Sequence, residues 1–223
     1  MGGMQVLQWV VSFPEMVRAL IPIATAAKHS PQQIAFNEVG RQAIMADADW
    51  KGGHYYGETE PVRGLAVARM VSHITYMSDI SMAEKFGRRV KEERPGTRFS
   101  PDSEVEGYIQ HQGDSFVKRF DANSYLYITK ALDLFDLANS AGLDKVLKSA
   151  HDTKFLVIAF KSDWLYPAYQ SKKIVRACKL AHLDVTYCEI NSTYGHDAFL
   201  LEAEEQEHFI RHFLRRVSDE QSL

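Results

Sequence analysis

Hydrophobic and polar positions follow two different periods along the chain, and the changes of period divide it into three segments. Residues 19–27 (ALIPIATAA) form a continuous apolar run, which is typical of a buried strand, whereas residues 30–47 have helical spacing. Ser30 followed by Pro31 is a helix start, because serine accepts a hydrogen bond from the first turn and proline fits the first helical position. We therefore predict that residues 1–57 form the first part of an α/β core.

The middle of the chain has helical spacing with almost no strand signal. Apolar residues recur at helical intervals in residues 61–86, 104–120 and 124–138. The charged stretch at 89–103, which contains a Pro-Gly pair, predicts an exposed loop. We predict that residues 58–148 form a helical cap, or lid, inserted into the core.

The third segment, residues 149–223, returns to a strand and helix alternation. Residues 154–160 (KFLVIAF) are continuously apolar, as in a strand that is covered on both faces, and residues 184–190 (DVTYCEI) predict a second strand. One helix is expected between the strands and another over residues 197–217. Consecutive strand and helix pairs predict right-handed parallel crossovers, so the fold class is α/β, with a parallel sheet between helices.

The composition narrows the classes of partner. With 223 residues, of which 45% are hydrophobic, the chain can bury a large core, and its formal net charge of −3 disfavours a nucleic acid or an acidic membrane surface as partner. The two cysteines, Cys178 and Cys188, form no CxxC pair, and no apolar run reaches the roughly 20 residues needed to span a bilayer. We expect a cytoplasmic protein that binds a small molecule or another protein.

Two loops that follow the predicted strands carry candidate catalytic residues. Asp163 follows the first strand in KSDWLYP, and His196 follows the second in NSTYGHDAF. Either residue alone is more often structural, but functional groups gather at the carboxyl ends of parallel strands. The acid precedes the histidine by 33 residues, which matches the chain order Ser, Asp, His of α/β-hydrolase triads. The pair therefore predicts a carboxylate that orients a general base.

The nucleophile of such a triad is not among the 223 residues. No GxSxG sequence occurs, but the chain begins with Met1, Gly2 and Gly3 and continues into a helical pattern. Gly2 would be the closing glycine of a nucleophile elbow if a serine stood immediately before Met1. Met1 would then be the residue after the nucleophile, whose N–H contributes to the oxyanion hole.

Several stretches together carry a family resemblance. They are MGGMQVLQW, which in the family follows a Gly-Gly-Ser, and FNEVGRQAIMADADWKGGHYY, GLAVARMVSHITYMS, RFDANSYLYITKALD, SDWLYP and YGHDAFL. The chain resembles the C-terminal portion of homoserine O-acetyltransferases over essentially its whole length. The resemblance implies a partial α/β-hydrolase sheet with an inserted helical lid, in a chain that lacks the N-terminal half of the sheet and the nucleophilic serine.

The resemblance also implies an activity. Acetyl-CoA would acylate the serine, and the acetyl group would pass to the side-chain hydroxyl of L-homoserine in methionine biosynthesis, by a ping-pong route. No permanently bound cofactor is implied, because acetyl-CoA is a co-substrate. Family members commonly form homodimers through the lid, which implies the same partner here.

Site residues follow by position from the same resemblance. Asp163 and His196 correspond to the triad acid and base, and Asp197 to the residue that receives the substrate ammonium. Arg69 and Tyr76, which are seven residues apart, correspond to residues that reach from the lid to the active site, the arginine toward the substrate carboxylate. From the residues alone, Arg69 and Tyr76 also fit a packing pair between helices.

Three alternatives remain open from the sequence. The acyl donor could be succinyl-CoA, and a plain hydrolase would use water in place of homoserine, although Arg69, Tyr76 and Asp197 disfavour it because an esterase needs no clamp for an amino acid. The third is a non-catalytic fragment that dimerises through its lid. Without a nucleophile and a complete oxyanion hole, we expect the 223 residues alone to be inactive.

Two further clusters are candidate binding sites. His208 and His212 are four residues apart on the last predicted helix, but HExxH and a third ligand are missing, so we predict no metal. Arg88, Arg89, Lys91 and Arg94 could meet the phosphates of coenzyme A, although a solvated loop is the simpler interpretation.

Overall fold

The computed structural model describes residues 1–90 and 102–220, which belong to two compact units. The sheet unit consists of Met1–His29 and Leu134–Leu223, and the helical unit consists of Ser30–Asp133. These limits differ from the predicted segments 1–57, 58–148 and 149–223, chiefly because the helix that follows Ser30 packs within the helical unit.

The sheet unit contains three parallel strands, in the order β1 (Ala19–Leu20), β2 (Lys154–Phe160) and β3 (Val185–Ile190). The α/β class and the two predicted strands of the third segment are confirmed. The strand expected over residues 19–27 is wrong in length, because Pro22 has no N–H to donate to the ladder. Pairing resumes beyond it as a single bridge, in which the Ala24 N–H donates to the Ile158 carbonyl over 2.9 Å.

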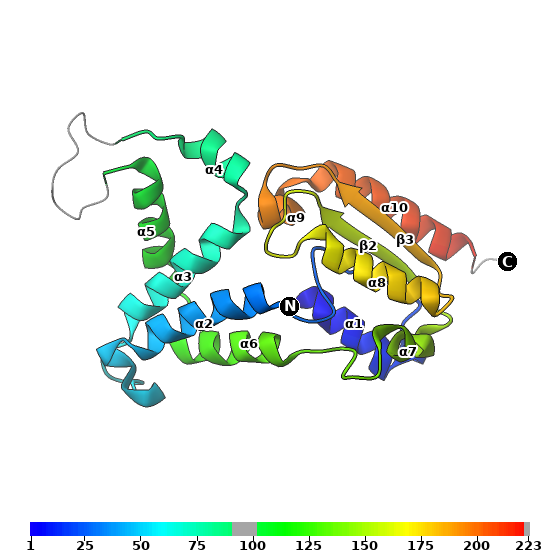
Figure 1. Cartoon of the computed structure of the whole chain (residues 1–223), viewed down its shortest axis with the longest axis horizontal. Coiled ribbons are helices and arrows are strands. Elements are labelled where there is room, and N and C mark those ends of the chain that lie inside the picture. Colours follow the sequence, from blue (N-terminus) through cyan, green and yellow to red (C-terminus); the bar gives the residue numbers. More distant parts are fainter. Residues whose placement is uncertain (91–101, 221–223) are drawn as a thin grey trace. The chain divides into compact units, whose positions relative to one another are not determined.

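Helices cover both faces of this sheet, so β2 is buried from both sides (Figure 1). Phe155 and Val157 face a core that includes residues of α1 (Gly2–Ser12), α7 (Leu143–Leu147) and α8 (Ala168–Leu180). Leu156, Ile158 and Phe160 face the opposite core, to which α10 (Ala203–Asp219) contributes. Because successive strand residues point to opposite faces, the continuous apolar run supplies both cores. The short helices η1 (Pro14–Met16) and η3 (Lys148–Ala150) precede β1 and β2.

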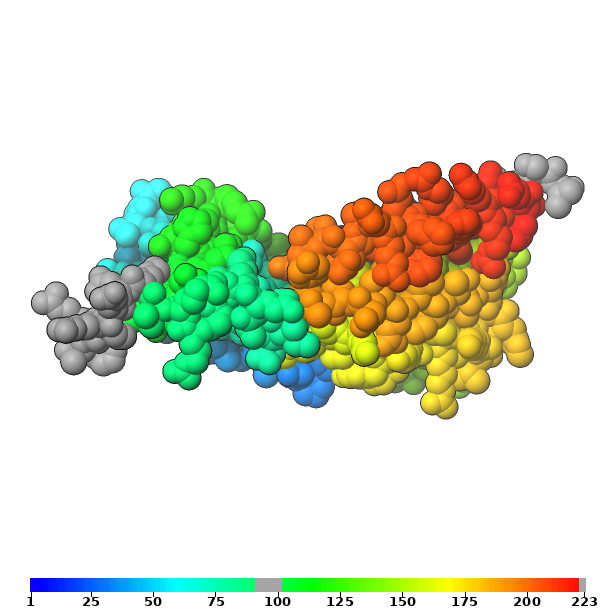
Figure 2. All heavy atoms as spheres, turned by 90° about the horizontal axis from the view of Figure 1, so that it is seen from above, coloured from blue at the N-terminus to red at the C-terminus, as the bar shows by residue number. Residues whose placement is uncertain are grey.

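The final helix is not continuous, which corrects the prediction of one helix over residues 197–217. It consists of η4 (Gly195–Asp197), α9 (Ala198–Leu201) and α10, with Glu202 at φ −87° and ψ 57° between the last two. The Gln206 side chain donates to the carbonyls of Phe199 and Glu202, which satisfies acceptors that the break exposes. Figure 2 shows α10, in red, on the surface of the sheet unit.

The helical unit contains α2 (Pro31–Met45), η2 (Ala48–Gly53), α3 (Val62–Tyr76), α4 (Asp79–Phe86), α5 (Glu104–Phe116) and α6 (Ala122–Leu134), the last ending one residue beyond the unit. The predicted helix start at Ser30 is confirmed: Ser30 and Gln33 form a reciprocal capping box. Most of the loop predicted over residues 89–103 lies outside the described residues. Within the described residues, no helix is long and apolar enough to cross a membrane.

Two contacts explain why α2 belongs to the helical unit. A Cβ on Gly64 of α3 would overlap the Ala43 carbonyl oxygen of α2, so the two helices approach as closely as only glycine permits. The buried Arg41 guanidinium of α2 donates to Asp133 of α6 over 2.7 Å and to Glu38 over 2.8 and 3.0 Å. The core of the unit is formed by Ile44, Tyr55, Leu65, Ala68, Phe116, Ala122 and Tyr125.

Candidate active site

The loops that follow β2 and β3 lie side by side at the carboxyl edge of the sheet. The Lys161 N–H donates to the Ile190 carbonyl over 3.0 Å, which extends the strand pairing by one residue. The chain after β2 then turns, and the Asp163 N–H donates to the Phe160 carbonyl over 3.2 Å. Parallel pairing thus brings residues that are 33 positions apart to one place.

Asp163 and His196 form a hydrogen-bonded pair at this edge. His196 Nδ1 lies 2.8 Å from Asp163 Oδ2, and the acid side chain is fully buried whereas that of the imidazole is 16% exposed. The other carboxylate oxygen, Oδ1, accepts the Tyr166 N–H over 2.7 Å. A buried carboxylate on Nδ1 favours the tautomer in which Nε2 carries the lone pair, so this arrangement suits a general base.

Gly195 joins the two loops just before the histidine. Its N–H donates to the Ser162 hydroxyl over 2.9 Å, and its φ of +71° is a left-handed value that glycine adopts without strain. Ser162 and Asp163 of one loop therefore contact Gly195 and His196 of the other. This double link fixes the spacing of the pair from both backbones.

Three residues of the site escaped the sequence analysis. The Tyr166 ring lies 5.1 Å from the His196 ring, and the Tyr166 hydroxyl is 2.9 Å from Nε2 of the buried His29. The Phe199 ring also contacts the imidazole, at 5.2 Å between centroids. Tyr166 lies three residues after Asp163 in the acid loop, a position that suggests a turn contact, but no spacing signal connects it with His29.

The remaining predicted residues of the sheet unit lie at two places. Met1 stands at the start of α1, where its carbonyl accepts the N–H groups of Met4 and Gln5, and a side chain on Gly2 would meet open space. Asp197 directly follows His196 at the end of η4. That Met1 contacts an oxyanion and that Asp197 contacts an ammonium group remain predictions.

Arg69 and Tyr76 lie together on α3 in the helical unit. The Arg69 guanidinium carbon is 5.2 Å from the centre of the Tyr76 ring and 4.9 Å from that of Phe116. Within the described residues, the buried Nε of Arg69 has no hydrogen-bond acceptor. The seven-residue spacing thus brings the pair into contact, as expected for one helix face, while substrate binding by the pair stays a prediction.

His73 lies between these two residues on α3. Its Nε2 is 2.8 Å from the Tyr108 hydroxyl, and its ring meets that of Tyr76 edge-on. Burial and then the positive charges of Arg69 and Lys85 lower the pKa of His73 from 6.5 to about 4. The imidazole is therefore neutral at pH 7.

The two secondary clusters gain no support as sites. The rings of His208 and His212 are 4.5 Å apart, but within residues 1–90 and 102–220 no three His, Cys, Asp or Glu side chains are grouped to hold a metal ion. Arg89 is paired with Glu104 over 2.7 Å, while Lys91 and Arg94 lie outside the described residues.

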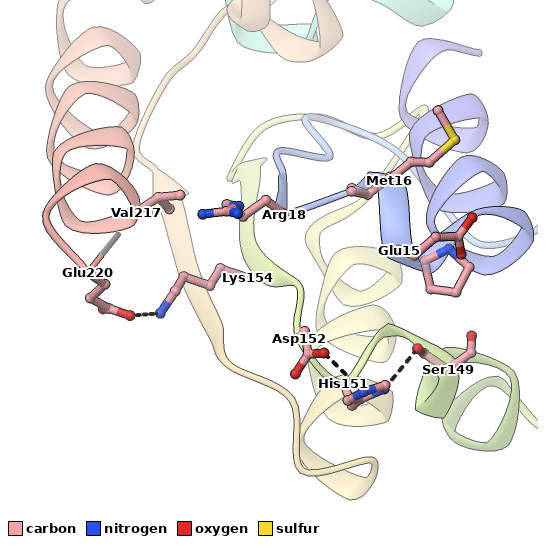
Figure 3. A pocket seen from close by; sticks show the side chains of 11 residues that line it. Glu15, Met16, Arg18, Ser149, His151, Asp152, Lys154, Val217 and Glu220 are labelled. Atoms are coloured by element: carbon pink, nitrogen blue, oxygen red, sulfur yellow. Dashed lines mark hydrogen bonds and ion pairs between the residues drawn. The ribbon is translucent and has the colours of Figure 1, made fainter. Parts of the chain in front are cut away.

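The structure also contains a surface pocket of about 680 Å³, and Figure 3 shows the residues that line it. It is lined by the segments that precede β1 and β2 and by the end of α10, so it opens at the amino ends of the strands. Its charges are mixed: Lys154 is paired with Glu220 and His151 with Asp152, while Arg18 and Glu15 also line it. Neither Asp163 nor His196 reaches it, and ligand sites of parallel sheets lie at the opposite edge.

Comparison with known proteins places these features in a family. Residues 1–203 match the family described as the alpha/beta hydrolase fold. The chain is 57% identical over 222 residues to a homoserine O-acetyltransferase of Methanohalobium evestigatum and 55% identical over 217 residues to one of Methanosphaerula palustris. These alignments cover 98% and 96% of this chain but only 45% and 44% of the relatives, so the chain spans less than half of their length.

A solved structure agrees with this assignment. The crystal structure of homoserine O-acetyltransferase from Bacillus anthracis superposes with a TM-score of 0.83 at 28% identity, covering 92% of this chain and 56% of that one. The sequence match and this superposition assign the same fold to the chain. The chain belongs to the alpha/beta hydrolase fold family.

Proposed function

We propose that this chain provides the acid, the base and the substrate clamp of a homoserine O-acetyltransferase, which transfers an acetyl group from acetyl-CoA to the hydroxyl of L-homoserine. The observation that carries the proposal is the hydrogen bond between His196 and Asp163 at the carboxyl edge of the sheet. Relatives of that name, 49–57% identical over nearly the whole chain, support the choice of reaction over others that the same pair could catalyse.

The proposed reaction has two steps, and His196 moves a proton in each. A serine that precedes Met1 attacks the thioester carbonyl and gives its proton to Nε2, and coenzyme A leaves with that proton as the free thiol. Homoserine then attacks the acyl-serine and its hydroxyl proton passes to Nε2. The same proton then passes to the departing serine oxygen, which regenerates the serine and the neutral histidine and releases O-acetylhomoserine. Asp163 stabilises the imidazolium in both steps, while the N–H of Met1 donates to the oxyanion.

Charged residues of the chain account for the choice of acceptor. Arg69 binds the homoserine carboxylate, supported by the absence of an acceptor for its buried Nε among the described residues. Tyr76, in contact with Arg69, lies beside that carboxylate, and Asp197 binds the ammonium group. A hydrolase that uses water needs none of these charges, so the transferase is the better candidate.

The proposal also covers the acyl donor, the oligomeric state and the cellular location of the enzyme. The relatives' names favour acetyl-CoA over succinyl-CoA as co-substrate. The proposed enzyme forms a homodimer through its helical lid, and the two unbridged cysteines suit a cytoplasmic location. We also infer that the 223 residues alone are inactive, because no GxSxG nucleophile sequence occurs among them.

The test joins this chain to the N-terminal part of a relative. The part of the Methanohalobium evestigatum relative that precedes its matched region is placed before Met1, and acetyl-CoA and L-homoserine are supplied. We expect O-acetylhomoserine from the joined protein and none from the chain alone, with slower product formation from succinyl-CoA. A folded joined protein that consumes acetyl-CoA at the same rate with and without homoserine would identify a hydrolase instead. An intact mass of the natural protein well above 25.4 kDa would independently indicate a longer chain.

A further inference from the structure

Tyr166 contacts structures at all three strand ends of the sheet unit. Its N–H donates to Asp163 in the loop after β2, over 2.7 Å, and its ring lies 5.1 Å from that of His196 in the loop after β3. Its hydroxyl is 2.9 Å from Nε2 of His29, which follows the β1 segment. A single residue thus meets the acid, the base and a histidine that the proposed mechanism does not use.

The hydrogen bond to Asp163 does not by itself fix the plane of the His196 ring. An imidazole with one bond at Nδ1 can still tilt about that bond, and packing against its faces limits the tilt. The rings of Tyr166 and Phe199 supply that packing, both with their centroids just over 5 Å from that of the imidazole. The position of the Tyr166 ring therefore bears directly on the direction of Nε2.

The position of the Tyr166 ring is set in turn by His29. Both side chains are buried, at 8% exposure each. Buried polar groups of this kind are costly to leave unpaired, so the hydroxyl is held to the ring nitrogen and the tyrosine cannot rotate away without breaking the bond. The link runs from the segment after β1, through Tyr166, to the base after β3.

We propose that Tyr166 is a positioning residue for His196 and that His29 acts through it, by anchoring the tyrosine hydroxyl. The inference rests on the proposed function only in treating His196 as the base. The contact restricts the orientation of the imidazole, and it does so without a nucleophile or a substrate. The variants Tyr166→Phe and His29→Leu each remove the same hydrogen bond, so they have the same effect on His196.

The experiment uses the 223-residue chain with ¹⁵N-labelled histidine. The exchange rate of the His196 Nδ1 proton with water is measured by NMR, with the resonance assigned by its loss in Asp163→Asn. Variants are Tyr166→Phe, His29→Leu, the double variant, and His29→Gln, whose amide can still donate to the hydroxyl. Tyr187→Phe is the control for the loss of a tyrosine hydroxyl elsewhere in the same unit, because the Tyr187 hydroxyl on β3 donates to Glu189 over 2.7 Å at an exposed position.

We expect exchange about fivefold faster in Tyr166→Phe, since the net worth of one hydrogen bond corresponds to a factor of that order. His29→Leu matches it, the double variant adds nothing further, and His29→Gln recovers part of the protection. Tyr166→Leu, which also removes the ring, abolishes the resonance. If that variant does not fold, Tyr166→Phe and His29→Leu still test the inference.

Three results would overturn the inference. The first is an unchanged exchange rate in Tyr166→Phe and His29→Leu. The second is an equally large increase of the rate in Tyr187→Phe, which would indicate general loosening of the unit. The third is a rate in the double variant that shows the two single effects added together. None depends on acetyl transfer. If the chain shows the expected exchange rates but the joined protein has no transferase activity, only the proposed function is refuted. If the joined protein is active but the exchange rates do not change as expected, only this inference is refuted.

Discussion

The sheet unit and the helical unit assemble their candidate functional residues in different ways. In the sheet unit, Asp163 and His196 are 33 residues apart and meet because β2 and β3 are parallel neighbours. In the helical unit, Arg69 and Tyr76 meet because seven residues are nearly two turns of α3. The first pair depends on tertiary topology and the second on a local period.

The two units also differ in what their buried polar groups do. The acid and base of the sheet unit lie at a strand edge and leave the interior of β2 wholly apolar. The helical unit buries Arg41 with Asp133 and the neutral His73 between its helices. Changes to polar residues should therefore affect activity in the sheet unit and stability in the helical unit, with Arg69 as the informative exception.

The largest expected effect is on the base. In the joined protein, His196→Ala should lower kcat for acetyl transfer by a factor on the order of 10⁶, because no other group takes the serine proton. Circular dichroism should show an unchanged fold. Residual transfer within tenfold of the unaltered protein would remove His196 from the mechanism.

The next effect tests whether the helical unit contributes to the reaction. Arg69→Ala should lower kcat/KM for homoserine by about 10- to 100-fold, the value of a charge-assisted hydrogen bond, and leave slow hydrolysis of acetyl-CoA. Arg69→Lys is the matched variant, which keeps the charge but loses the planar fork. Unchanged homoserine kinetics in Arg69→Ala would leave the arginine as a packing residue on α3.

The stability of the helical unit should depend on its buried ion pair. Arg41→Met leaves the Asp133 carboxylate, whose side chain is 5% exposed, without its cation and should lower the free energy of unfolding by about 3–5 kcal/mol. Urea denaturation measures this. Glu38→Gln, at a half-exposed partner of the same arginine, should cost about 1 kcal/mol or less. Equal losses in the two variants would contradict the distinction between buried and exposed charges.

His73 should make stability depend on pH. Its pKa is about 4 in the folded protein and 6.5 when unfolded, so the unfolded chain binds a proton first as the pH falls. Stability should thus be complete above pH 6.5 and decline toward pH 4, by up to about 3 kcal/mol. The comparison is urea denaturation of the unaltered chain and of His73→Gln at several pH values. If the free energy of unfolding of His73→Gln falls between pH 6.5 and 4.5 as steeply as that of the unaltered chain, other groups cause the pH dependence.

The smallest effect should come from the helix start at Ser30. Ser30→Ala removes the side-chain acceptor for the Gln33 N–H and should cost about 1 kcal/mol, whereas Ser30→Asp should cost little, since aspartate caps equally well. Thermal unfolding of the two variants checks this. A loss in Ser30→Asp as large as that in Ser30→Ala would show that capping is not what the serine provides.

Local signals in the sequence predicted the elements that depend on neighbouring residues. The apolar run at 154–160 became a strand buried on both faces, and Ser30 with Gln33 became a capping box. The prediction of a strand over 19–27 gave too little weight to Pro22, although its missing N–H is visible in the sequence. The break at Glu202 has no comparable local signal, because the helical pattern continues through it.

The sequence by itself determined the helix start at Ser30, the central strand, and the residue types on which the candidate chemistry depends. The tertiary structure decided that α2 packs with α3, through the closeness that Gly64 permits, and that Tyr166 links His29 to His196. The physical reason is range: capping and periodic burial act within a few residues, whereas a contact between strand ends depends on strand order and register. Those are properties of the whole folded unit, which no local stretch of sequence specifies.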